Sequence, residues 1–242
     1  MRVDAPARWS SRARQLRGHC VTEVGTHGKH LLVATSCDLT VHCHAMIYGS
    51  WQFGAPGMTL RKPQRQVRLR LRTVEREAVF FNGPVMELLT PEELAAHGRL
   101  TRLGPDVMSD TFDGNEAWCR LFLDAQRETG DAVLDQRIVA GIGNIYKSES
   151  LFLTGILPTR MVSSLGRQQV DRLWNMARHL MWRDARRSGP IVTLDDPLRR
   201  DGDRHWVYRR RGRPCFRCGT RIEMVRQGEL RRATYFCPTC QV

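Results

Sequence analysis

The sequence predicts an α+β protein with three parts: an N-terminal antiparallel β-sandwich, a central helical region and a small C-terminal β-hairpin held together by cysteines. Short β-rich runs separated by turn residues fill the first third of the chain, and helical spacing replaces them after Thr90. Near the end, four of the eight cysteines form two Cys-x2-Cys pairs. We therefore expect domains at residues 1–95, 96–203 and 204–242.

The first domain is predicted from five short runs of β-branched or alternating residues. Turn residues separate these runs, as at residues 25–28 and 37–38. Short strands at this spacing are typical of an antiparallel sandwich or barrel. The runs are residues 21–24, 31–34, 39–42, 67–71 and 78–81.

The central domain is predicted from helical spacing. Thr90, Pro91 and Glu93 provide a capping residue, a first-turn proline and an early carboxylate, which together indicate a helix start. Helical spacing then recurs at residues 116–125, 131–139, 145–153 and 168–186. Gly141 and Gly143 would break a helix, and two glycines so close together allow a turn whose N–H groups face outward beside a helix N-terminus. Such a turn either binds a phosphate or simply connects two helices.

The C-terminal domain is predicted from two Cys-x2-Cys pairs with 18 residues between them, a spacing found in four-thiolate zinc ribbons. A pair of redox motifs is the alternative, but no βαβ pattern surrounds them. Since all four ligands would be sulfur and no position stays open, we expect one structural zinc ion. Its ligands would be Cys215, Cys218, Cys237 and Cys240.

Charge and composition indicate an acidic partner. The formal net charge is +13, and residues 204–242 hold ten arginines against two glutamates. This excess favours contact with a polyanion such as nucleic acid. We find no apolar run long enough to span a bilayer and no apolar N-terminal leader, so we expect a cytoplasmic protein without a membrane partner.

Residues 135–146, Asp-Gln-Arg-Ile-Val-Ala-Gly-Ile-Gly-Asn-Ile-Tyr, resemble the helix-two-turns-helix signature of the formamidopyrimidine-DNA glycosylase and endonuclease VIII family. Residues 207–241 resemble the zinc finger of that family, and residues 26–32 and 46–51 resemble its N-terminal domain on the endonuclease VIII side. The resemblance implies a base-excision repair glycosylase that removes oxidised bases and cuts abasic sites through a Schiff base. Its partner would be damaged double-stranded DNA, bound by a monomer on the bacterial nucleoid.

The resemblance also implies roles for single residues. Lys29 matches the hairpin lysine assigned as an acid in β-elimination, and Arg232 matches the zinc-finger arginine assigned to δ-elimination. Asn144 and Arg102 match DNA-binding positions. A further triplet in the family fills the gap left by the everted base, and its first residue here replaces an expected glutamine. The triplet corresponds to Met46, Ile47 and Tyr48.

One part of the family pattern has no match. The family begins Met-Pro-Glu-Gly, and the amine of its proline, freed by loss of the methionine, is the nucleophile. The printed sequence begins Met-Arg-Val-Asp, so no residue is assigned to that role or to the glutamate's. The open interpretations are a start site placed too far downstream, an inactive homologue that binds damaged DNA, or another amine, from Lys29 or Met1. A zinc-ribbon DNA-binding regulator is a further alternative, but it leaves residues 135–146 without an explanation.

Overall fold

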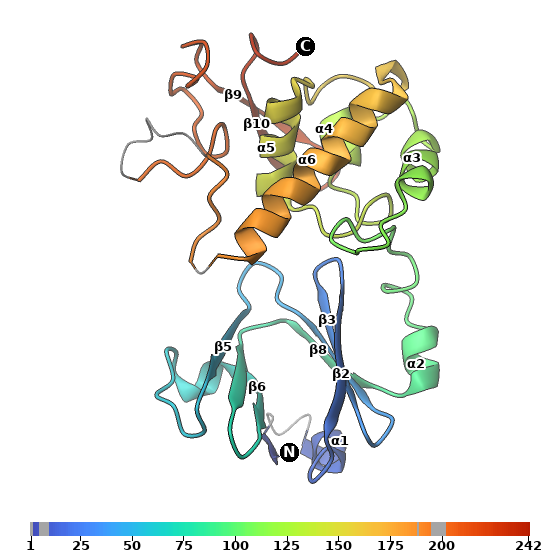
Figure 1. Ribbon diagram of the computed structural model, residues 1–242, viewed down its shortest axis with the longest axis vertical. Helices are drawn as coiled ribbons and strands as arrows, with labels where there is room; N and C mark the ends of the chain where they lie inside the picture. Colours follow the sequence, from blue (N-terminus) through green and yellow to red (C-terminus); the bar gives the residue numbers. More distant parts are fainter. Residues whose placement is uncertain (1, 5–9, 188, 195–201) are drawn as a thin grey trace. The chain divides into compact units, whose positions relative to one another are not determined.

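The structure is a computed structural model that describes residues 2–4, 10–187, 189–194 and 202–242. The chain divides into two compact units, Met1–Arg102 and Leu103–Val242, and Figure 1 traces both. The first unit is built mainly from strands. The second is built mainly from helices and ends in a two-stranded hairpin. The predicted α+β class is therefore confirmed.

Two four-stranded antiparallel sheets form the first unit, in the orders β1-β6-β7-β5 and β2-β3-β4-β8. Their inner faces share one apolar core, to which Val33 and Val41 contribute from one sheet and Leu69 and Phe80 from the other. This arrangement is the predicted sandwich. The elements are β1 (Arg2–Asp4), α1 (Ser10–Gln15), β2 (Val21–His27), β3 (His30–Thr35), β4 (Thr40–His44), β5 (Ser50–Gly54), the 3₁₀-helix η2 (Gln64–Gln66), β6 (Val67–Arg72), β7 (Glu77–Phe81), β8 (Val85–Leu89) and α2 (Pro91–Ala95).

The first predicted turn is shorter than residues 25–28. Strand β2 continues to His27, which pairs with His30 of β3, so only Gly28 and Lys29 form the connection. Gly28 has a φ of +58°, and a glycine at the first turn position suits a two-residue type II′ hairpin. This tight turn places Lys29 at the tip of the hairpin. Strands β1, β5 and β8 are additions to the five predicted runs.

The second unit packs its helices around buried residues such as Val139, Leu151, Leu173 and Trp174. Helices α5 and α6 lie side by side, and the terminal hairpin packs against α5 (Figure 1). The unit's elements are α3 (Gly114–Phe122), α4 (Thr129–Ala132), α5 (Asn144–Thr154), the 3₁₀-helix η3 (Val162–Ser164), α6 (Arg167–Ala185), β9 (Glu223–Gln227) and β10 (Arg232–Phe236).

The helix predicted over residues 131–139 is wrong, because α4 ends at Ala132. Local side-chain bonds replace the helix. Asp135 Oδ1 accepts the Arg137 N–H at 3.0 Å, and Gln136 Nε2 donates to the carbonyls of Leu134 and Ile142 at 2.8 and 2.9 Å. These bonds favour turns over a continuous helix. The other predicted helices are present, and α2 starts after Thr90 as predicted, where Thr90 and Glu93 form a capping box.

Candidate nucleic-acid interface

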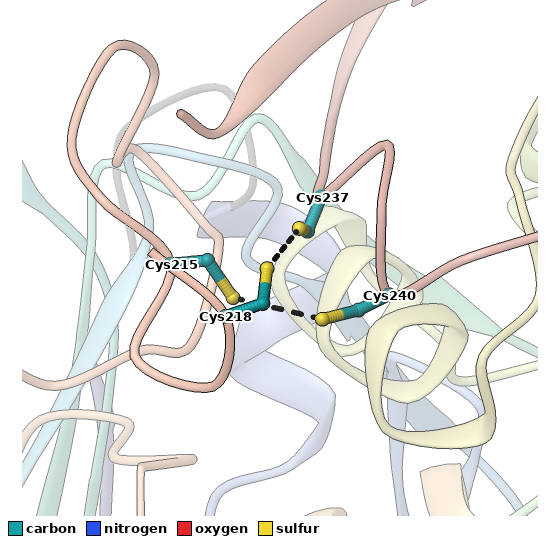
Figure 2. A group of neighbouring side chains, drawn as sticks. All are labelled: Cys215, Cys218, Cys237 and Cys240. Carbon is teal, nitrogen blue, oxygen red and sulfur yellow. Dashed lines mark hydrogen bonds between the residues drawn. The ribbon is translucent and has the colours of Figure 1, made fainter. Parts of the chain in front are cut away.

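The four predicted zinc ligands lie together at the end of the second unit. Cys215 and Cys218 come from the turn before β9, whereas Cys237 and Cys240 follow β10 (Figure 2). The Sγ atoms of Cys215 and Cys240 are 3.9 Å apart, and those of Cys218 and Cys237 are 3.4 Å apart. Four thiolates around a tetrahedral zinc, with Zn–S bonds of about 2.3 Å, would lie about 3.8 Å from one another. The cluster therefore fits a structural zinc site.

The hairpin that carries this cluster rests on helix α5. Asn144 Nδ2, at the start of the helix, donates to the Ala233 carbonyl of β10 at 2.8 Å. One turn later, the Tyr235 N–H donates to Ser148 Oγ at 3.3 Å. The two regions that the sequence singles out, the glycine-containing turn and the arginine-rich hairpin, are therefore in direct contact.

The turn before α5 differs in one respect from expectation. The Gly141 N–H does not face outward, because it donates to Gln136 Oε1 at 3.0 Å. Gly141 has a φ of +103°, which favours glycine, and a Cβ at this position would lie 3.2 Å from Val107 Cγ1. At Gly143, the N-cap of α5, no side chain caps the helix. The first N–H groups of α5, which form the positive end of the helix dipole, are thus not capped by a side chain. Asn144, the first residue of the helix, is half-buried.

The hairpin region presents positive charge with little neutralisation. Among residues 203–242, which the structure describes, the one ion pair joins Arg213 Nη1 to Asp203 Oδ1 at 3.8 Å. Arg232, at the start of β10, is half-buried and has no carboxylate partner in the described part of the chain. The exposed arginines here are Arg204, Arg209, Arg211, Arg213, Arg217, Arg221, Arg226 and Arg231. Such a surface attracts phosphate groups.

A buried carboxylate that the sequence analysis missed ties α5 to the segment leading into the hairpin. Both oxygens of Glu149 accept backbone N–H groups, from Val207 and Tyr208 at 2.9 and 2.8 Å and from Trp206 at 2.8 Å. The Thr193 hydroxyl donates to it as well. Burial raises the pKa of Glu149, but all four bonded groups are donors, so this geometry fits the carboxylate. No motif reveals this role, since the donors lie more than forty residues away in the sequence.

In the first unit, Lys29 and the predicted gap-filling triplet lie at the same end of one sheet. His30 pairs with His44 across β3 and β4, so the tip of the β2–β3 hairpin lies at the same sheet end as the turn after β4. Met46 has a φ of +51°, and its N–H donates to His44 Nδ1 at 3.0 Å. The triplet is strongly exposed, at 58%, 69% and 74% for Met46, Ile47 and Tyr48.

Arg102 is exposed at the end of the first unit. The structure therefore brings Asn144 and the Arg232 hairpin together in one unit, and Lys29 and the triplet together in the other.

Behind Lys29, the outer face of the β2-β3-β4-β8 sheet holds a buried polar network that the sequence analysis missed. We call it the histidine row: His30, His42, Glu87 and His97. His30 Nδ1 and His42 Nε2 are 2.8 Å apart, His42 Nδ1 is 2.7 Å from Glu87 Oε2, and His97 Nε2 is 3.0 Å from the same oxygen. Burial lowers the pKa of His30 to about 3, with smaller contributions from neighbouring His44 and His42, and burial also lowers the pKa of His42.

Three members of the histidine row, His42, Glu87 and His97, have the residue types of a metal site. Tetrahedral zinc ligands of this kind would be about 3.3 Å apart, given bonds of about 2.0–2.1 Å. The observed 2.7 and 3.0 Å instead match hydrogen bonds. The Leu100 N–H donates to His97 Nδ1 at 3.3 Å, which places the His97 proton on Nε2, facing the carboxylate. The geometry is therefore that of a hydrogen-bonded network of neutral histidines.

Comparison with known proteins agrees with this geometry. The family model described as the formamidopyrimidine-DNA glycosylase H2TH domain matches residues 103–195, and that described as the zinc finger found in FPG and IleRS matches residues 212–242. In the described part of the chain, no helix combines the length and apolar character of a membrane span.

Similar curated proteins cover nearly the whole chain. A probable endonuclease 8 2 of Streptomyces coelicolor is 42% identical over 230 residues, which cover 93% of this chain and 80% of that protein. Endonuclease 8 of Escherichia coli is 34% identical, with 94% and 85% covered. Among solved structures, the Lactococcus lactis FPG bound to FAPY-dG-containing DNA has a TM-score of 0.79 at 21% identity, covering 99% of this chain and 91% of that one.

Proposed function

The chain belongs to the formamidopyrimidine-DNA glycosylase and endonuclease VIII family of base-excision repair enzymes, and we propose that it removes an oxidised base from double-stranded DNA and cuts the strand at the abasic site. The contact between Asn144 and the β10 backbone carries this proposal. It sets the uncapped N-terminus of α5 beside the hairpin of Arg232, where backbone N–H groups and a guanidinium can bind neighbouring phosphates.

The proposed chemistry begins when an amine attacks the sugar C1′. The glycosidic bond breaks, the base leaves with a proton, and an imine links protein and sugar. β-Elimination then breaks the C3′–O bond and δ-elimination breaks the C5′–O bond, after which water hydrolyses the imine. We assign Lys29 as the acid in the first elimination and Arg232 to the second, following the family pattern. The attacking amine is not assigned to a residue of the printed sequence.

Binding must also hold the damaged nucleotide outside the base stack, which costs a few kcal/mol. We propose that Asn144 and Arg102 bind the backbone, while Met46, Ile47 and Tyr48 fill the vacated space. The 58–74% exposure of these three apolar side chains supports the second role, since a wedge must be free to enter DNA.

We propose one structural zinc ion in the four-cysteine cluster, held by thiolates that leave no position for substrate. The ion would keep the hairpin folded and take no part in bond breaking. We further propose that the protein acts as a monomer on the nucleoid in the bacterial cytoplasm.

Borohydride trapping tests the proposed activity. The full chain is incubated with duplexes that contain an oxidised pyrimidine, an abasic site or no damage, and the imine is reduced to a stable adduct. We expect an adduct with both damaged duplexes and none with undamaged DNA. Tight binding to abasic DNA without an adduct would identify an inactive damaged-DNA-binding homologue. Absence of both binding preference and adduct would refute the proposed function.

A further inference from the structure

Helix α5 contains a lysine in an unusual position. Lys147, its fourth residue, is fully buried, and its Nζ has no hydrogen-bond partner among the described residues. Buried lysines are rare and normally paired, because removing an ammonium group from water is costly. A lysine kept only for stability would have a carboxylate or carbonyl partner. Lys147 therefore needs another explanation.

Two charged groups act on Lys147, and they come from α4 and β10, two of the elements packed against α5. Asp131 of α4 attracts its charge and Arg232 of β10 repels it. However, Asp131 already accepts hydrogen bonds from Arg127 Nε and Nη2 at 3.0 and 2.7 Å. Arg232 has no carboxylate partner in the described part of the chain. Lys147 lies between Asn144 and Ser148, which both hydrogen-bond to β10, the strand of Arg232. The carboxylate that acts on Lys147 is already paired with Arg127.

Like charges at close range favour binding of an anion. On its own, the pair of Lys147 and Arg232 is destabilised by mutual repulsion. A phosphate arriving at Arg232 would offset that repulsion, and the adjacent uncapped N-terminus of α5 would add to the attraction. The binding of an anion and the charge of Lys147 should therefore reinforce each other.

We infer that Lys147 is a positioning residue for Arg232: its buried charge repels the guanidinium and so orients it toward the phosphate of a bound DNA strand. This inference rests on the proposed function, because it concerns the elimination assigned to Arg232. It adds a buried residue to those that the resemblance assigns.

The inference also predicts that DNA binding is coupled to protonation of Lys147. Burial lowers the pKa of Lys147 to about 8, and the charge of Arg232 contributes in the same direction. An anion beside Arg232 would raise this pKa, so DNA binding near pH 8 should take up a proton. DNA affinity should accordingly fall as the pH rises above about 8.

Lys147→Met tests the role, because methionine keeps most of the side-chain length and removes the charge. Lys62→Met, the same change in the other unit, is the control. Removing an unpaired buried charge should leave the melting temperature unchanged or raised, and zinc content unchanged. On abasic-site DNA, we expect the δ-elimination product to fall at least about fivefold relative to the β-elimination product, the lower end of typical coupling between sites. The control should keep the wild-type ratio.

Two outcomes would overturn the inference: a wild-type product ratio in Lys147→Met, or the same loss of affinity between about pH 7 and pH 9 in both proteins. Should the variant fail to fold, calorimetry of the wild type binding a non-cleavable abasic analogue, in buffers of different ionisation enthalpy, measures proton uptake directly. No uptake near pH 8 would also overturn it. Because these binding measurements need no catalysis, they still test Lys147 if borohydride trapping refutes the enzyme.

Discussion

Acid should destabilise the first unit through His30. This side chain is 5% exposed, and burial lowers its pKa to about 3 from the ordinary value of 6.5. The unfolded chain therefore binds the proton first. The contribution of neutral His30 to stability is complete above about pH 6.5 and is lost progressively as the pH falls from there toward 3.

The size of the effect follows from these two pKa values. At pH 5 the unfolded imidazole is almost fully protonated and the folded one almost neutral, which gives a loss of about 2 kcal/mol relative to pH 8. This is an upper value, because any relaxation of the folded state around the charge would reduce it. Asp135 does not titrate in this window, because hydrogen bonds from Arg137 and Arg127 overcome the effect of burial and hold its pKa at about 2.

The assay compares wild type with His30→Asn, which retains a donor for His42 Nε2 but does not titrate. Urea unfolding at about pH 8 and pH 5 gives the free energy of unfolding for each, and the difference between the proteins isolates His30 from other groups, such as His205. His179→Asn, at an exposed position of α6, is the control and should behave as wild type. An equal acid loss in wild type and His30→Asn would refute a neutral, buried His30.

Three further predictions concern the second unit. Asn144→Ala removes the 2.8 Å bond to β10 and a proposed phosphate contact, so affinity for abasic DNA in a fluorescence anisotropy titration should weaken about tenfold; an unchanged affinity would remove this residue from the interface. Chelation of the zinc should unfold the hairpin and lower affinity for damaged and undamaged DNA alike, and full affinity in metal-free protein would contradict the role given to the cluster. Glu149→Gln places an amide against three backbone donors and should cost about 1–3 kcal/mol by thermal unfolding, whereas Glu75→Gln, at an exposed position, should cost little.

Several features were predictable because they depend on local residue patterns. The clustering of the four cysteines was predictable from their spacing, since two Cys-x2-Cys turns can fold around one ion at this spacing. The start of α2 at Thr90 was predictable, because the capping residue and the carboxylate three positions later are local signals. The division into domains at residues 95 and 203 stays a prediction, although Leu103–Val242 forms one compact unit.

Other features depend on distant partners and could not be read locally. Residues 131–139 have helical spacing, but the Gln136 side chain hydrogen-bonds to the backbone of Gly141 and Ile142 and so stabilises a turn there. The histidine row is formed by strand register, which sets His42 opposite Glu87 of a strand 45 residues away. The partners of Glu149 and the isolation of Lys147 are likewise consequences of tertiary packing. A sequence shows that these residues can ionise, but it does not show which groups surround them in the folded protein.

Helix α5 shows how these features combine. Its first turn presents Asn144 to β10, it buries Lys147, on which the charge of Arg232 acts, and Glu149 binds the segment that leads into the hairpin. One helix therefore contacts both the segment before the hairpin and the second strand of the hairpin. Because the same helix supplies the proposed phosphate site, a shift of the hairpin would move Arg232 relative to the phosphate that it must contact. The proposed thiolate ligation of zinc and the buried bonds of Glu149 thus act together: both hold the hairpin that carries Arg232 near the N-terminus of α5.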